Sequence, residues 1–210
     1  MNPVPAQMID RWKDRTDQAP GEGIVYWHML IGEHPQAVAL ATDAQQRLAP
    51  FSGLHMTPLQ WLHMTALIAG PASQITSQQL DQMAAAATRL LAGTPPITVT
   101  LGKILYHPEA IMLAASPASA LTPVREAARS ATREVTGTDG RPGIRSPWTP
   151  HITLCYSTAH QPAEPIIAAL GHELPGRDIQ ISTISLVIQH GPERHWDWHP
   201  VATTRLGAAM

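Results

Sequence analysis

Residues 146–157 read Ser-Pro-Trp-Thr-Pro-His-Ile-Thr-Leu-Cys-Tyr-Ser. A serine and two prolines lead into a run of β-branched and aromatic residues, which is typical of a strand that begins after a turn. Because alternate side chains of a strand share a face, we expect His151 and Thr153 to point the same way as Cys155. Tyr156 should point to the opposite face, into the core. A histidine and a threonine side by side at the start of a strand are suited to holding an oxyanion.

A second pair of this kind stands earlier in the chain. Residues 62–67 read Leu-His-Met-Thr-Ala-Leu, again a short apolar run with His63 and Thr65 on one face. A third His-x-Thr, which begins at His55, is followed closely by Pro58, and proline disfavours a continuing central strand. We therefore expect His55 to lie in a loop, near the site at most. The functional interpretation rests on the other two pairs.

The composition is that of a soluble globular protein. A length of 210 residues with 44% hydrophobic side chains allows one large domain or two small lobes with a buried core. The net charge of -2 excludes a global basic field for a long nucleic acid but leaves a small anionic substrate possible. We expect no membrane span, because no run approaches about 18 apolar residues. Residues 1–15 lack the apolar core of a secretory signal and Cys155 is the only cysteine, so we expect a cytoplasmic location.

Predicted strands alternate with predicted helices along the chain. Besides the two His-Thr stretches, strands are expected at 24–32, 97–105, 110–115, 179–189 and 195–206, and helices at 35–48, 77–91, 121–135 and 164–170. Ser77 and Thr122 are the expected N-caps of the second and third helices. Each half has a His-Thr strand, a helix and a hairpin, which indicates α/β or α+β layers in two lobes with approximate two-fold symmetry. Residues 1–23 are expected to be a polar lead-in with a short helix at 8–15.

The two His-Thr stretches resemble the paired signatures of the two-histidine (2H) phosphoesterase superfamily, and most closely its bacterial 2'-5' RNA ligase / RNA 2',3'-cyclic phosphodiesterase branch. The residues that carry the resemblance are Leu-His-Met-Thr at 62–65, followed by Gly70, and Pro-His-Ile-Thr-Leu at 150–154. It covers roughly residues 24–206 in motif order and strand–helix order. Relatives often carry a basic residue shortly after the second motif, where this chain has Cys-Tyr-Ser at 155–157.

The resemblance implies a fold, an activity and a set of site residues. The fold would be a single bilobal domain over 24–210, with two mostly antiparallel sheets flanked by helices and both His-Thr pairs facing a central cleft. The activity would be hydrolysis of 2',3'-cyclic phosphodiesters without metal or cofactor, sometimes with reversible 2'-5' RNA ligation. His63, Thr65, His151 and Thr153 would be the catalytic residues.

The chemistry of these side chains fits that activity. Opening a cyclic phosphodiester needs a base that takes a proton from water and an acid that protonates the leaving oxygen, and two imidazoles supply both near neutral pH. The hydroxyls of Thr65 and Thr153 can donate to the non-bridging oxygens. We expect His63 to be the acid toward the ribose oxygen and His151 the base toward water, although the sequence does not fix this order.

Other residues are candidates for substrate binding. Trp148 precedes His151 and could stack on a base or sugar, with packing against the wall of the site as an equal alternative. Arg141 and Arg145 lie in a glycine-rich loop and could reach a phosphate, or remain solvated. Residues 195–199, His-Trp-Asp-Trp-His, would place two histidines and an aspartate on one strand face, as in a zinc site. The alternating tryptophans favour an amphipathic edge strand instead, and we expect no metal.

The sequence thus predicts a monomeric, metal-independent cyclic phosphodiesterase acting on RNA ends or small cyclic nucleotides. One alternative keeps the site but changes the substrate to a non-RNA cyclic phosphate. Another is an RNA- or nucleotide-binding module whose site is silent.

Overall fold

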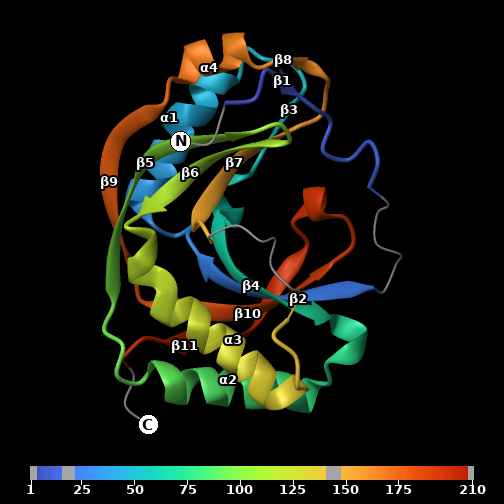
Figure 1. Cartoon of the computed structure of the whole chain (residues 1–210), viewed down its shortest axis with the longest axis vertical. Coiled ribbons are helices and arrows are strands. Elements are labelled where there is room, and N and C mark those ends of the chain that lie inside the picture. Colours follow the sequence, from blue (N-terminus) through green and yellow to red (C-terminus); the bar gives the residue numbers. More distant parts are fainter. Residues whose placement is uncertain (1–3, 16–21, 141–147, 208–210) are drawn as a thin grey trace.

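The computed structural model describes residues 4–15, 22–140 and 148–207, which form two main antiparallel sheets flanked by helices (Figure 1). The first sheet has the strand order β11 (Trp198–Arg205), β10 (Thr183–His190), β2 (Gly23–Leu30), β4 (His63–Pro71). The second sheet has the order β3 (Leu54–Met56), β7 (His151–Ser157), β6 (Ala110–Ser116), β5 (Ile97–His107), β9 (Glu173–Ile181). The predicted mixed fold with antiparallel sheets is confirmed.

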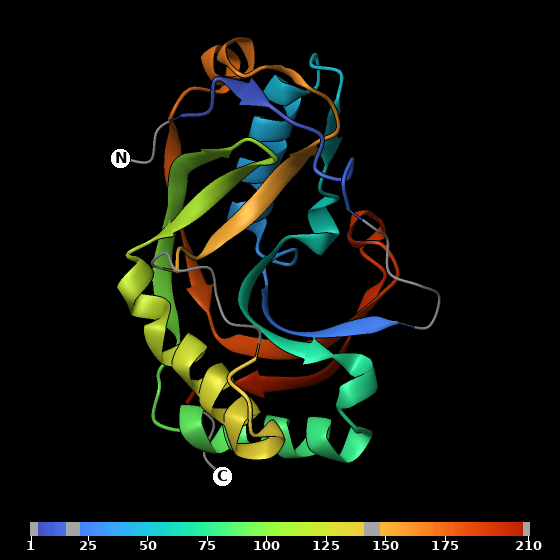
Figure 2. The same cartoon turned by 45° about the vertical axis from the view of Figure 1, so that its right-hand side comes forward.

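Each sheet contains one of the two histidine strands, β4 at the edge of the first sheet and β7 between β3 and β6 in the second. In the first sheet β4 pairs with β2, and in the second sheet β7 pairs with β6. One helix separates β2 from β4 and another separates β6 from β7; they are α1 (Pro35–Leu48) and α3 (Thr122–Thr136). Each of these helices packs against the opposite sheet, since α1 contacts β7 and β9 whereas α3 contacts β4 (Figure 2). This exchange of helices ties the lobes into one unit.

The other two helices complete the layers. They are α2 (Ser77–Leu91), which packs on α3 and β11, and α4 (Glu164–Leu170), which packs on α1. The N-cap of α2 is Thr76 and not the predicted Ser77, because Thr76 forms a capping box with Gln79 three residues later. Thr122 lies inside α3, whose N-cap Leu121 makes no side-chain bond, and Gly137 ends the helix with φ 75°. None of the helices in the described residues is long and apolar enough to cross a membrane.

The strand predicted at 179–189 is two strands. β9 ends at Ile181 and pairs with β5 of the second sheet, whereas β10 begins at Thr183 and pairs with β2 and β11 of the first. The chain therefore crosses from one sheet to the other at Ser182. Apolar periodicity does not reveal this crossing, because both segments are strands with a buried face.

The strand predicted from residue 195 begins later, at Trp198. Residues Glu193–His195 form a 3-10 turn called η4, and Trp196 follows in the left-handed region with φ 49°. His195, Asp197 and His199 therefore do not share one face of a strand, as a zinc site there would need. The prediction that residues 195–199 belong to one strand is wrong.

The N-terminal segment, residues 4–15, lies along the second sheet. β1 (Gln7–Met8) pairs with β8 (Gln161–Pro162), and the side chain of Met8 is fully buried. The backbone N–H of Ile9 donates to Pro108 and that of Arg11 donates to Ser157, both at 2.9 Å. The expected short helix at 8–15 does not form, because backbone groups of Met8, Ile9 and Arg11 are paired with β8, Pro108 and Ser157 instead.

Candidate active site

The two histidines of the predicted motifs are held in the same way. His63 is the first residue of β4 and His151 is the first residue of β7. The Nδ1 atom of His63 lies 2.7 Å from the carbonyl oxygen of Trp61, and that of His151 lies 2.7 Å from the carbonyl oxygen of Thr149. Because a carbonyl only accepts, Nδ1 carries the proton in both rings. Nε2 of each neutral ring is then the atom available to exchange a proton with a ligand.

The fold brings the two motifs together. Strands β4 and β7 pack against each other, and the charge of His151 lowers the pKa of His63, so the rings interact electrostatically. Thr65 and Thr153, both half-buried, lie two residues further along the same strands. The indole N–H of Trp148 donates to the carbonyl oxygen of Thr65 at 3.2 Å. This bond connects the segment just before the second motif with the first motif.

Both candidate histidines favour the neutral form. Burial is the largest cause that lowers the pKa of His63 below its ordinary value, and the same holds for His151. The bonds to the carbonyls of Trp61 and Thr149 act in the opposite direction. The carboxylate of Glu193 also raises the pKa of His63. The carboxylate of Glu193 therefore partly offsets the effect of burial on the pKa of His63.

A third histidine, His28, lies against His63 and was not among the predicted site residues. It stands on β2 opposite Thr65, is 2% exposed, and its ring centroid is 4.2 Å from that of His63. Its Nδ1 has no hydrogen-bond partner among the described residues. Burial first, and then the charge of His63, hold the pKa of His28 well below its ordinary value. The neutral imidazole of His28 thus covers one side of His63. The sequence offered one indication of this role, which was that His28 stands on a predicted strand.

Aromatic side chains also cover His63. Trp198 meets the rings of both His28 and His63 at 5.7 Å, and Trp61 packs edge-on against Trp198 at 4.6 Å. These contacts limit the orientations open to the His63 ring and exclude water from one side of it. The low local dielectric that results strengthens charge interactions at His63.

Tyr156 is buried as predicted, but in a second, smaller core cluster with Trp196 and Trp198, on the face of β7 opposite to the one predicted. On β6, Met112 pairs with Thr153 and the adjacent Ile111 pairs with Cys155, so β7 carries one extra residue between these positions. Such a bulge reverses the alternation of faces. Cys155 is consequently in the main core, while the hydroxyl of Tyr156 hydrogen-bonds Thr153 and donates to Glu193 at 3.4 Å. Burial, the largest cause, raises the pKa of Tyr156.

His55 is also placed differently from its prediction. It lies on β3, an edge strand, opposite Tyr156, and not in a loop. Its ring stacks on Trp196 at 5.0 Å, and its Nε2 lies 3.2 Å from the carbonyl oxygen of Arg194. The strand forms because it is short and ends at Met56, two residues before Pro58, so the proline is outside the ladder.

The predicted substrate-binding residues have different outcomes. Arg141 and Arg145 lie outside the described residues. Trp148 is half-buried, and the guanidinium of Arg125 lies over its ring at 5.2 Å. Its indole N–H donates to the carbonyl oxygen of Thr65, so packing is its observed role. Whether it also stacks on a base stays a prediction.

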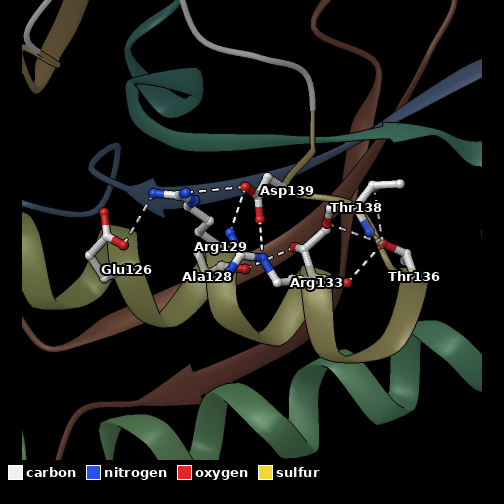
Figure 3. A network of polar contacts seen from close by, with 8 residues as sticks. Glu126, Ala128, Arg129, Arg133, Thr136, Thr138 and Asp139 are labelled. Carbon is white, nitrogen blue, oxygen red and sulfur yellow. Dashed lines mark hydrogen bonds and ion pairs between the residues drawn. The ribbon is translucent and has the colours of Figure 1, made fainter.

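Several arginines of α3 and of the N-terminal segment have acidic partners. On α3, Arg129 and Arg133 both pair with Asp139, which follows the helix, and these contacts lower the pKa of Asp139 to about 2 (Figure 3). Arg11, from the N-terminal segment, binds Glu193 with Nε and Nη2 at 2.9 Å and Glu109 with Nη1 at 3.0 Å. Arg11 was missed because residues 1–23 carry no motif and read as a polar lead-in.

Comparison with known proteins places the chain in a family and identifies solved structures with the same fold. A family model described as "2'-5' RNA ligase superfamily" matches residues 32–193. The solved structure of TT0787 of Thermus thermophilus is 19% identical, with TM-score 0.66, over 89% of this chain and 100% of that one. E. coli LigT complexed with 3'-AMP is 14% identical, with TM-score 0.66, over 90% and 100%. A structure described as a phosphoesterase is 15% identical, with TM-score 0.63, over 90% and 100%. No curated protein matches the sequence.

Proposed function

Because the chain belongs to the 2'-5' RNA ligase superfamily, we propose that it is a two-histidine phosphodiesterase that hydrolyses 2',3'-cyclic phosphodiesters of RNA ends or small nucleotides. The observation that carries the proposal is the matched anchoring of His63 and His151. Each Nδ1 is held by a carbonyl oxygen at 2.7 Å, which leaves each Nε2 as the atom that can move a proton.

The proposed reaction uses one protonated and one neutral imidazole. His151 takes a proton from water as the water oxygen attacks phosphorus, and a bond between phosphorus and one ribose oxygen breaks. His63 gives its proton to that leaving oxygen. The charge of Glu193 is consistent with this assignment, because it raises the pKa of His63, whereas burial lowers the pKa of both histidines.

Thr65 and Thr153 are proposed to hold the non-bridging oxygens of the phosphate. Each lies two residues beyond its histidine on the same strand, so the spacing of a strand puts hydroxyl and imidazole on one side. Hydroxyl donors aimed at the oxygens that carry charge stabilise the transition state. The same steps with a 5' hydroxyl in place of water would join a cyclic phosphate end to that hydroxyl, which is 2'-5' ligation if the 3' oxygen leaves and the 2' oxygen is retained.

Small substrates are favoured over long RNA. The net charge is -2, and Arg11, Arg129 and Arg133 are held in ion pairs and are not arranged as an open basic stripe. LigT, which shares the fold, has been solved with 3'-AMP. We further propose that the protein acts as a monomer in the cytoplasm.

The test compares substrates in the presence of a chelator. The panel contains 2',3'-cyclic mononucleotides, a short RNA ending in a cyclic phosphate, and a cyclic phosphate without a nucleobase, and the products are separated as 2'- and 3'-phosphates. Turnover of the nucleotides to a 2'-phosphate supports the proposal and His63 as the acid at the 3' oxygen. Turnover of the non-nucleotide compound alone would move the function to another cyclic phosphate. Binding without product from about pH 5 to 9 would indicate a silent binding site.

A further inference from the structure

The guanidinium of Arg11 is held by Glu193, Glu109 and Tyr156, of which Glu193 and Tyr156 interact with candidate site residues. Its Nε and Nη2 form a forked pair with the carboxylate of Glu193, and its Nη1 donates to Glu109. The same group lies over the ring of Tyr156, 4.4 Å from the centroid. The side chain of Arg11 is 16% exposed, and its backbone N–H is anchored to Ser157 at the end of β7. A planar fork on a carboxylate combined with stacking on an aromatic ring is a geometry that lysine cannot reproduce.

The partners of Arg11 lead directly to the predicted catalytic residues. The hydroxyl of Tyr156 donates to Glu193 and accepts a hydrogen bond from the hydroxyl of Thr153. Glu193 interacts electrostatically with His63. Hydrogen bonds thus connect the N-terminal segment through Glu193 and Tyr156 to Thr153, and the charge of Glu193 connects it to His63.

The negative charge of Glu193 would repel an anionic substrate, and Arg11 offsets this repulsion. The carboxylate of Glu193, whose side chain is 38% exposed, acts electrostatically on His63 in a site proposed to hold a phosphodiester, and like charges repel. Arg11 pairs with both Glu193 and Glu109, and Arg15 also contacts Glu109, at 2.5 Å. The titratable groups that face Glu193 and His63 from other elements are His28 on β2, His151 on β7 and Tyr156.

We propose that Arg11 is a positioning residue of the candidate site, which neutralises Glu193 toward the substrate phosphate and holds Tyr156 so that it orients the hydroxyl of Thr153. This inference rests on the proposed function. It makes the N-terminal segment part of the working site, although this segment is far in sequence from both motifs.

Steady-state kinetics on a 2',3'-cyclic nucleotide test the inference with four variants. Arg11→Gln leaves Glu193 unpaired and is expected to raise KM about tenfold or more, with a smaller fall in kcat. Arg11→Gln combined with Glu193→Gln removes the unpaired carboxylate and should recover most of the loss in KM. Arg11→Lys keeps the positive charge but not the forked pair with Glu193, and its KM should lie between those of wild type and Arg11→Gln. Arg47→Gln is the matched control, because Arg47 forms an exposed pair with Asp43 on α1, and it should match wild type.

A second readout does not depend on turnover. The pKa of the His63 imidazole, followed by NMR, should rise in Arg11→Gln, where Glu193 is no longer neutralised, and fall in Glu193→Gln. Wild-type KM in Arg11→Gln together with an unchanged His63 pKa would overturn the inference, as would a double variant no better than Arg11→Gln. If the wild type turns over none of the cyclic phosphates but the pKa shifts occur as stated, the proposed function fails while the link from Arg11 to the site stands.

Discussion

Trp148 donates its indole N–H to the carbonyl oxygen of Thr65 at 3.2 Å, and this bond joins the two His-Thr motifs across the sheets. Trp148 comes just before β7, and Thr65 is in β4, so the bond sets the position of one motif strand relative to the other. Two imidazoles that act on opposite sides of one phosphorus need such a fixed separation.

Replacing Trp148 by phenylalanine keeps an aromatic ring over Arg125 but removes the donor to Thr65. We expect a loss of stability of about 1 kcal/mol, typical of one hydrogen bond, and a fall in kcat of several-fold as the two motifs lose their alignment. Thermal unfolding and steady-state kinetics measure the two effects. An unchanged kcat with a raised KM would instead assign Trp148 to stacking on the substrate.

The pH dependence of kcat/KM follows from the two lowered pKa values. Activity should rise with pH as His151 loses its proton and fall as His63 loses its own, which gives a bell-shaped profile with apparent values that belong to the pair. Since burial lowers both pKa values from 6.5, the maximum should lie on the acidic side of 6.5. Rates measured from about pH 4.5 to 8.5 locate it. A profile that is flat, or that peaks above neutrality, is incompatible with this assignment.

His28 is expected to limit stability in acid. Its pKa is lowered in the folded state. Below about pH 6.5 the unfolded chain therefore binds a proton at this histidine that the folded chain does not bind, and the free energy of unfolding falls as the pH falls. His28→Phe removes this proton uptake and preserves an aromatic ring against His63. The loss of melting temperature between about pH 7 and pH 5 should therefore be smaller in His28→Phe than in wild type.

The matched control for this prediction is His160→Gln, a change at an exposed position. It should lose as much melting temperature in acid as the wild type does. An equal loss in all three proteins would show that His28 does not contribute to the acid sensitivity.

What the sequence predicted well depends on local patterns. The helices at 35–48, 77–91 and 164–170 have the expected limits, because apolar spacing and flanking prolines and glycines act over a few residues. The His63 and His151 strands were also found, since each motif opens a run of apolar strand-forming residues.

What the sequence did not predict depends on contacts between distant segments. The face of Tyr156 is set by a bulge against Ile111 and Met112, which no pattern within β7 reveals. Arg11 lies near Tyr156 because its backbone N–H donates to Ser157 at the end of β7, and His28 lies beside His63 because β2 pairs with β4. The Asp139 partner of Arg129 and Arg133 could not be seen from the helix alone, because it lies beyond the glycine that ends α3.

The measurement that tests the central claim most directly is the turnover of a 2',3'-cyclic nucleotide, with chelator present, by wild type, His63→Asn and His151→Asn. Circular dichroism checks that each variant is folded. The account predicts that the chelated wild type is fully active and that each variant loses about 100-fold or more in kcat, because each imidazole carries one proton transfer. Turnover that requires a divalent metal, or that survives the loss of either histidine, would contradict it.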